Sequence, residues 1–251
     1  MPSSSPDTPL IQVRNLHQNF DSHRVLQGVD VDIYPNETVC LLGKSGGGKT
    51  VLIKHMIGLM QPSQGSIKIG GVDISNMGER ELAPIRKKIG MMFQNGALFD
   101  SLNVAQNIAF PLREEGIKDV DELNQRVSEV LEIVNLSGQE EKMPSDLSGG
   151  MQKRVALARA IVVQPECICY DEPHAGLDPI TAEKIDNLIK QLQQERGITN
   201  IVITHELRSV FRIADRIIFM KNGKAYWQGS PDEMKASSDP TLSNFIAGSE
   251  S

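Results

Sequence analysis

The chain has 251 residues and a net charge of −6. It is long enough for one large α/β domain or for a core with a smaller subdomain, and its charge argues against a broad nucleic-acid-binding surface. Hydrophobic residues make up 39% of the chain, yet no window approaches the ~20 consecutive apolar residues that a membrane-spanning helix needs. We therefore expect a cytosolic protein that would act on a membrane only through a partner.

The first part of the chain predicts a short tail followed by strands around a glycine-rich loop. Residues 1–9 lack the basic start and apolar segment of a signal peptide and are expected to form a flexible tail. Strands are expected at 10–13, 25–33, 38–42 and 89–93, a hairpin over 66–74, and helices from 51 and over 79–88. Phe20 lies in a polar stretch, 17–23, which we expect to be a loop. Its ring could stack on a nucleotide base or fold back onto the core.

The second part predicts a helical insertion and then a return to the sheet. From residue 95 to about 155 the pattern is helical, with an amphipathic helix from Asp121, and we interpret this region as an all-helical insertion. Strands are then expected at 166–170 and 200–203 on either side of a helix over 181–196, followed by a hairpin that pairs 217–220 with 225–227. This alternation predicts a parallel sheet with crossover helices. We expect one domain over 10–230 and a C-terminal tail over 231–251.

The stretch Gly43-Lys44-Ser45-Gly46-Gly47-Gly48-Lys49-Thr50 matches the phosphate-binding pattern G-x-x-x-x-G-K-[ST] at every fixed position. Its glycines let the backbone turn N–H groups onto a phosphate, Lys49 adds a positive charge, and the Thr50 hydroxyl offers an oxygen to Mg²⁺. A buried strand precedes the loop, and the helix that opens at Val51 directs its positive end at the phosphates. The alternative is an ordinary glycine-rich turn, which these flanks disfavour. The sequence predicts a nucleoside triphosphate site.

Two adjacent carboxylates, Asp171 and Glu172, follow the expected strand 166–170. They should emerge at the C-terminal edge of the sheet, where α/β proteins bind ligands. Because neighbouring side chains of a strand point to opposite sides, Asp171 can hold Mg²⁺ while Glu172 orients and deprotonates a water that attacks the γ-phosphate. His205 follows another apolar strand and should lie at the same edge. It could donate a hydrogen bond to the γ-phosphate, although from the residue alone a structural histidine is the more frequent outcome.

A second anion site is predicted at the end of the helical insertion. Ser148 is a good N-cap for a helix that includes residues 153–163, and Gly149 and Gly150 leave the N–H groups of its first turn uncovered. The alternative is a capped helix without a ligand.

Together these motifs resemble the nucleotide-binding subunits of ABC transporters over nearly the whole chain. The phosphate loop, the LSGGM motif at 147–151, the strand end at 168–173, Gly176-Leu177-Asp178 and His205 occur in the family's order and approximate spacing. The resemblance implies an α/β P-loop NTPase (RecA-like) core with a small antiparallel β subdomain, and hydrolysis of ATP with Mg²⁺ in a dimer of two copies. It assigns Gln94 to the glutamine that contacts Mg²⁺ and nucleotide, Phe20 to the ring that stacks on adenine, and Asp178 to the loop that links the two sites. Most members have Tyr where Phe20 stands.

A narrower likeness points to the ATPase of Mla-type phospholipid transporters. It rests on residues 51–59, 93–104, 110–114 and 239–248. It implies an integral membrane permease and an MCE-domain lipid carrier as partners, a place on the cytoplasmic face of the inner membrane, and no nucleic acid. The apolar run 96–99 would contact the permease, or alternatively belong to the core of the insertion.

Two features depart from that group: His174, where Phe or Thr is usual, and a chain that stops soon after Gly248. Two other readings remain open. An ABC importer for amino acids or metals would differ only in its partner. A soluble ABC ATPase that acts on nucleic acid or ribosomes would carry a long coiled coil or a second ATPase domain, and neither pattern is present in this sequence.

Overall fold

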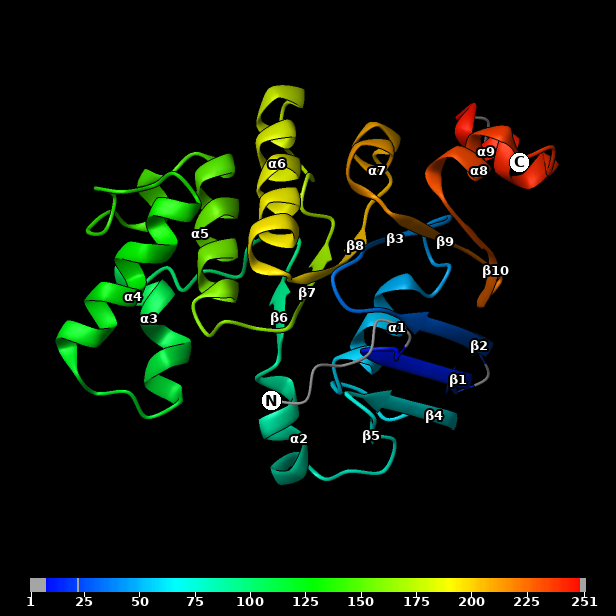
Figure 1. The fold of residues 1–251 in the computed structure, drawn as a ribbon, viewed down its shortest axis with the longest axis horizontal. Helices are drawn as coiled ribbons and strands as arrows, with labels where there is room; N and C mark the ends of the chain where they lie inside the picture. The colour runs from blue at the N-terminus through cyan, green and yellow to red at the C-terminus, as the bar shows by residue number, and fades with distance from the viewer. Residues whose placement is uncertain (1–7, 22, 249–251) are drawn as a thin grey trace.

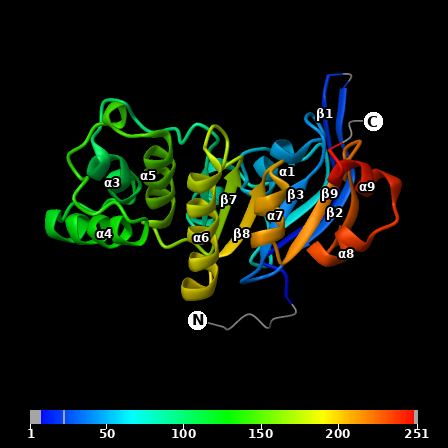
Figure 2. The same cartoon turned by 90° about the horizontal axis from the view of Figure 1, so that it is seen from above.

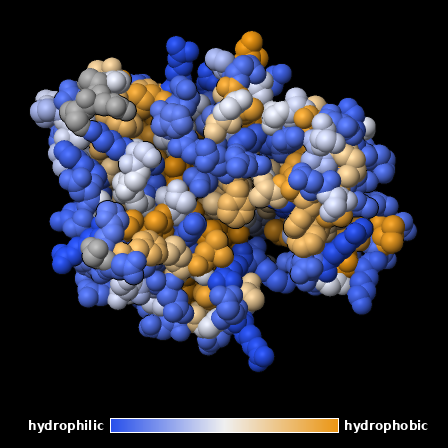
Figure 3. All heavy atoms as spheres, turned by 180° about the vertical axis from the view of Figure 1, so that it is seen from behind, coloured by the Kyte–Doolittle hydropathy of each residue, from blue (hydrophilic) through white to orange (hydrophobic). Residues whose placement is uncertain are grey.

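The computed structural model describes residues 8–21 and 23–248 and contains two β-sheets with a group of helices at one end (Figure 1). Most of the expected flexible tail, residues 1–7, lies outside the described residues. No helix in the described part of the chain is both long and apolar enough to cross a membrane. On the face seen in Figure 3, apolar side chains gather in separate patches among hydrophilic ones.

A six-stranded sheet forms the centre of the fold. Its order is β10-β9-β3-β8-β7-β6, and all neighbours are parallel except β9 and β10. The strands are β3 (Thr38–Leu42), β6 (Ile89–Met92), β7 (Cys167–Asp171), β8 (Thr199–Ile203), β9 (Arg216–Lys221) and β10 (Lys224–Gly229). Asn222 and Gly223, with φ of 51° and 71°, form the two-residue turn of the β9–β10 hairpin. The predicted parallel sheet and hairpin are confirmed.

Helices and a second sheet cover the two faces of this central sheet. The helices are α1 (Lys49–Met56), α2 (Glu79–Arg86), α6 (Pro179–Arg196) and α7 (Leu207–Ile213). In β3, Val39 and Leu41 pack with α1 and the second sheet, whereas Cys40 and Leu42 face the core that includes α6 and α7. Because successive side chains of a strand alternate between faces, a sheet covered on both sides needs apolar residues at every position. All five residues of β3 are buried.

The second sheet is antiparallel, with the order β2-β1-β4-β5. Its strands are β1 (Ile11–Phe20), β2 (His23–Ile33), β4 (Gln64–Ile69) and β5 (Val72–Asp73). The expected loop over 17–23 is wrong, because β1 continues to Phe20 and pairs with β2 from His17↔Gln27 to Phe20↔His23. Backbone pairing satisfies the main chain of this hairpin end whatever its side chains, so polar residues do not exclude a strand there. The predicted hairpin over 66–74 is confirmed.

The helical insertion occupies one end of the molecule in both ribbon views (Figures 1 and 2). It consists of α3 (Val104–Glu114), α4 (Val120–Ile133), a 3₁₀ turn η1 (Pro144–Asp146) and α5 (Gly149–Ile161). The predicted apolar face of α4 is buried, including Leu123, Val127 and Leu131. Asn103 caps α3 by accepting a hydrogen bond from the backbone N–H of Gln106 at 2.8 Å.

The segment expected as a C-terminal tail contains two short helices, α8 (Pro231–Ala236) and α9 (Pro240–Ile246). Met234 and Leu242 are fully buried in the core on the α6 side of the central sheet. The ring of Phe245 packs edge-on against Phe219 of β9, with centroids 4.9 Å apart. Residues 231–248 are therefore docked against the central sheet.

Candidate functional site

The phosphate loop connects β3 to α1 and packs tightly against two strands. Gly43, Gly46 and Gly48 have positive φ, of 137°, 75° and 91°. A Cβ on Gly43 would collide with the carbonyl oxygen of Met220 in β9, and one on Gly48 would lie 2.7 Å from the Leu26 side chain. Gly48 is also the N-cap of α1 and offers no side-chain hydrogen bond to it. The first N–H groups of α1, from Lys49 to Val51, thus lie at the loop without a side-chain cap, as an anion site requires.

Lys49 folds back over this loop. Its Nζ donates to the carbonyl oxygens of Gly43 at 2.7 Å and Lys44 at 2.9 Å. Burial lowers the pKa of Lys49, and the charges of Glu172 and Asp171 oppose that shift. The Lys49 ammonium group therefore interacts electrostatically with both carboxylates, as expected for residues that share one site.

Asp171 ends β7 beside the phosphate loop. Burial and the neighbouring Glu172 raise the pKa of Asp171, while a hydrogen bond from the Thr50 side chain and the charges of Lys54 and Lys49 lower it. A carboxylate and a hydroxyl that meet in this way are hard oxygen donors of the kind that Mg²⁺ prefers. Thr50 and Asp171 therefore fit the magnesium site that the sequence predicts.

Glu172 adopts a left-handed backbone conformation, with φ of 51°. Its backbone N–H donates to the carbonyl oxygen of Ile203 at 2.9 Å, which ties the residue to the end of β8. Its Oε2 lies 2.9 Å from Nδ1 of His205, whose side chain is 75% exposed against 18% for Glu172. The structure thus brings together the two residues predicted as catalytic. An uncommon backbone conformation in a non-glycine residue is itself frequent at functional sites.

The loop after β6, which carries Gln94, is held by α5, the helix that begins in the LSGGM motif. The buried Lys153 donates from Nζ to the carbonyl oxygen of Gln94. Arg159, two turns further along α5, donates to the carbonyl oxygens of Gly96 and Ala97, both at 2.8 Å. Burial lowers the pKa of Lys153, and Glu172 and Asp171 oppose that shift.

Lys153 therefore lies near Asp171 and Glu172, although sequence reasoning missed it. The signal in the sequence that could have identified it is a lysine on the apolar face of a predicted helix.

The second predicted anion site lies at the N-terminus of α5. The Ser148 side chain accepts a hydrogen bond from the Met151 backbone at 3.4 Å, which confirms it as the N-cap. Gly150 leaves no room for a Cβ against Thr181. Asp178 caps α6, accepting from the backbone N–H groups of Ile180 and Thr181 at 3.0 Å. The hydrogen bond from the Thr181 side chain is the largest cause that lowers the pKa of Asp178.

The structure does not bring this second site to the phosphate loop of the same chain. In both ribbon views α5 and α1 are separated along the long axis of the molecule, with α6 and β7 between them (Figures 1 and 2). The residues at 148–150 are thus grouped with α6, while Lys49, Asp171, Glu172 and His205 form a separate group at the sheet edge.

Phe20, predicted to stack on a base, lies at the end of β1 and is 43% exposed. Its hairpin borders the phosphate loop: a Cβ on Gly48 would meet Val25 and Leu26 of β2, and Gln27 donates from its backbone to Gly223 at 2.8 Å. An exposed ring beside a phosphate site is placed where a base could stack on it.

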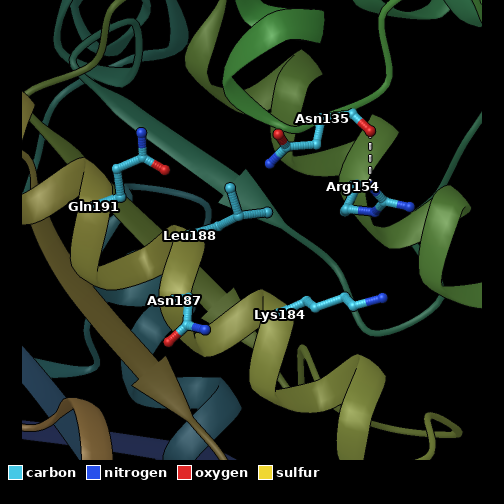
Figure 4. A pocket seen from close by; sticks show the side chains of 6 residues that line it. All are labelled: Asn135, Arg154, Lys184, Asn187, Leu188 and Gln191. Atoms are coloured by element: carbon cyan, nitrogen blue, oxygen red, sulfur yellow. Dashed lines mark hydrogen bonds between the residues drawn. The ribbon is translucent and has the colours of Figure 1, made fainter.

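The described structure also contains cavities away from the group formed by Lys49, Asp171, Glu172 and His205. One of about 330 Å³ opens between α5 and α6 and is lined by Asn135, Arg154, Lys184, Asn187, Leu188 and Gln191 (Figure 4). In it Arg154 donates to the carbonyl oxygens of Val134 at 3.1 Å and Asn135 at 2.9 Å, at the end of α4. In the phosphate loop, Lys44, Ser45 and Gly46 are exposed, whereas Gly43 and Gly48 are buried.

Comparisons with known proteins agree with this geometry. A family described as "ABC transporter" matches residues 26–175. The chain is 39% identical over 238 residues to the probable ribonucleotide transport ATP-binding protein mkl of Mycobacterium leprae, covering 95% of this chain and 69% of that protein. It is 38% identical over 239 residues to the intermembrane phospholipid transport system ATP-binding protein MlaF of Haemophilus influenzae, covering 95% and 90%. A dimeric ATP-binding cassette solved in a post-hydrolysis state with ADP and Pi has a TM-score of 0.81 and 31% identity, covering 88% of this chain and 98% of that one.

Proposed function

We propose that this chain, which belongs to the ABC transporter family and is an ATP-hydrolysing transporter ATPase, powers the movement of phospholipid between two membranes. The observation that carries the phospholipid assignment is the 38% identity to MlaF, with 90% of that protein covered. The rival substrate class is ribonucleotide, from the 39% identical mkl protein, of which 69% is covered.

The proposed chemistry uses the residues at the sheet edge. Lys49 and the N–H groups of the loop would hold the phosphates, and Glu172 would accept a proton from the attacking water. His205, 2.9 Å from Glu172, would orient that carboxylate and donate to the γ-phosphate. Thr50, Asp171 and Gln94 would hold Mg²⁺, which neutralises charge on the β- and γ-phosphates.

The active form would be a dimer of two copies. Each Ser148 helix end would meet the nucleotide on the partner's phosphate loop. In a two-fold symmetric dimer this contact occurs twice, because each chain gives its Ser148 helix end and receives that of its partner. Support comes from the separation of α5 from α1 in one chain and from the dimeric cassette that this chain resembles. Asp178, grouped with α5 through Thr181, would lie between the two sites.

A membrane permease would dock on the insertion beside the Gln94 loop. Phe99 and Phe110 are 41% and 36% exposed, and their rings lie 4.7 Å apart. The guanidinium of Arg159 lies 5.8 Å from the Phe99 ring and also binds the loop carbonyls. Leu98 instead packs against the core of the insertion. Of the apolar run 96–99, Phe99 is thus the residue available to a partner, and the chain would sit at the cytoplasmic face of the inner membrane.

Replacing Phe99 and Phe110 with serine tests this surface. We expect the double variant to lose most of the permease in a pull-down while it keeps its thermal unfolding midpoint, because both rings are partly solvent-exposed. Val72→Ser is the control, since Val72 is 45% exposed on the other sheet. Full recovery of permease by the folded double variant would rule out this docking surface.

The substrate class is tested by purifying the chain with its permease and analysing what the complex carries. Phospholipid, together with ATPase activity that rises when phospholipid is added, is the expected result. An MCE-domain protein in the same complex would support the Mla type. Ribonucleotide cargo without lipid stimulation would overturn the phospholipid assignment and leave the ATPase unaffected.

A further inference from the structure

A fully buried histidine lies between the helix of the phosphate loop and the strand that carries Phe20. His55, in the last turn of α1, has no exposed surface. Its Nδ1 is 2.7 Å from the carbonyl oxygen of Val51, and its Nε2 is 3.0 Å from Oε1 of Gln18 in β1. Both partners are acceptor oxygens and burial lowers the pKa of His55, so the neutral ring donates its single N–H to one of them and only contacts the other. These contacts reach both α1 and β1 and set the orientation of the ring.

His55 and Ser63 together contact the three residues before Phe20. Gln18 contacts His55, and its neighbours His17 and Asn19 are hydrogen-bonded to Ser63. Ser63 donates from its backbone to the carbonyl oxygen of His17 at 3.0 Å, and its hydroxyl accepts from the Asn19 backbone at 3.3 Å. The same hydroxyl lies 3.4 Å from Oε1 of Gln18. We call His55 and Ser63, which hold residues 17–19, the clamp.

The clamp lies where the sheet no longer supports β1. Pairing of β1 with β4 ends at His17↔Gln64, and beyond it only β2 accompanies the strand. This end of the β1–β2 hairpin projects past the neighbouring strands in Figure 2. Since a two-stranded ribbon is only marginally ordered by itself, the position of Phe20 depends on the contacts that reach its last residues.

We propose that His55 is a positioning residue for nucleotide binding, acting through Gln18 on Phe20. Its helix begins at the phosphate loop and its ring holds the strand of Phe20, so one side chain fixes the distance between the phosphate and base subsites. The inference rests on the proposed stacking role of Phe20. Only the binding of the nucleotide base, and not that of the phosphates, would depend on His55.

The test compares two ligands by calorimetry: ADP, which fills both subsites, and inorganic pyrophosphate, which fills only the phosphate subsite. We expect His55→Leu to weaken ADP about two- to tenfold, the usual net effect of one hydrogen bond, and to leave pyrophosphate unchanged. Phe20→Ala should weaken ADP about tenfold, as loss of one stacked base does. Because His55 would act through Phe20, adding His55→Leu to Phe20→Ala should cause no further loss.

Further variants separate positioning from folding. Ser63→Ala should reproduce the ADP-selective loss with a smaller effect, and His55→Gln, which can still bond Gln18, should restore part of the affinity. His174→Leu is the matched control, because His174 is also buried and hydrogen-bonded, with Nε2 2.7 Å from Asp186. It should leave the ratio of ADP to pyrophosphate affinity unchanged.

Four outcomes overturn the inference. An equal loss of ADP and pyrophosphate affinity in His55→Leu would show that His55 merely supports the phosphate loop. Additive losses in the double variant would show that it does not act through Phe20. If Phe20→Ala itself leaves ADP affinity unchanged, the stacking role falls as well. A loss in Phe20→Ala with none in His55→Leu or Ser63→Ala removes only the present inference.

Discussion

Glu172 combines a left-handed backbone with a charged side chain held by His205 at 2.9 Å. Glu172→Gln keeps the size of the side chain and removes the base. We expect ATP hydrolysis to fall by about 10²–10⁴-fold, the usual contribution of general-base catalysis, while ATP still binds. The measurement is turnover at saturating ATP together with binding of labelled ATP. Glu206→Gln, an exposed neighbour of His205, should turn over normally. Near-normal turnover by Glu172→Gln would remove it from the catalytic role.

At the residue scale, sequence could anticipate side chains whose place follows from a strand end. Asp171 and Glu172 follow one apolar strand and His205 another, and parallel strands bring such ends to one edge of the sheet. Lys153 and His55 could not be anticipated in this way. Their roles depend on partners 59 and 37 positions away in the chain, which only the folded structure brings into contact.

Among the elements, those with an apolar period or a turn signal were predictable, and the hairpin end that carries Phe20 was not. The central strands and the face of α4 follow from burial, which leaves a periodic pattern in the sequence. Residues 17–20 carry no such pattern, because their strand is set by pairing with β2. Similarly, α8 and α9 are helices of six and seven residues, too short to show a period.

Helix α9 offers a pH-dependent prediction. Asp239 caps it, accepting from the Thr241 backbone at 2.7 Å, and also accepts from the Tyr226 hydroxyl at 2.7 Å. The Tyr226 bond is the main cause that lowers the pKa of Asp239. A lowered pKa means that the ionised carboxylate stabilises the fold above its ordinary pKa of about 4, and that this stability is lost as the pH falls through the lower folded value.

We therefore expect Asp239→Ala to speed amide hydrogen exchange in residues 241–246 relative to wild type at pH 7. The difference should begin to shrink as the pH falls below about 4 and should disappear once the wild-type carboxylate is protonated, at its lowered pKa in the folded protein. Asp232→Ala in α8 is the control, because its contact with Lys235 is an exposed ion pair at 3.7 Å. A difference that persists at low pH would show that Asp239 acts by packing instead of charge.

For the whole molecule, the separation of α5 from α1 means that each nucleotide site should need two chains. Lys49→Ala and Ser148→Arg should each be inactive alone, since every dimer then lacks one half of both sites. In a mixed dimer, one site carries both changes and the other carries neither. With random pairing and independent sites, roughly a quarter of wild-type ATPase activity should return, because half of the dimers have one intact site of two.

The control for this mixing experiment is Ser145→Arg, an exposed serine in η1 that caps nothing and should be active alone. Sites complete within one chain would give no rescue. Strict coupling between two sites would also suppress rescue, so crosslinking distinguishes these cases. Cysteines placed at position 148 and at Ser45 in the phosphate loop should join two different chains when ATP is bound to a Glu172→Gln background. No rescue and no crosslink between chains would together exclude the two-chain site.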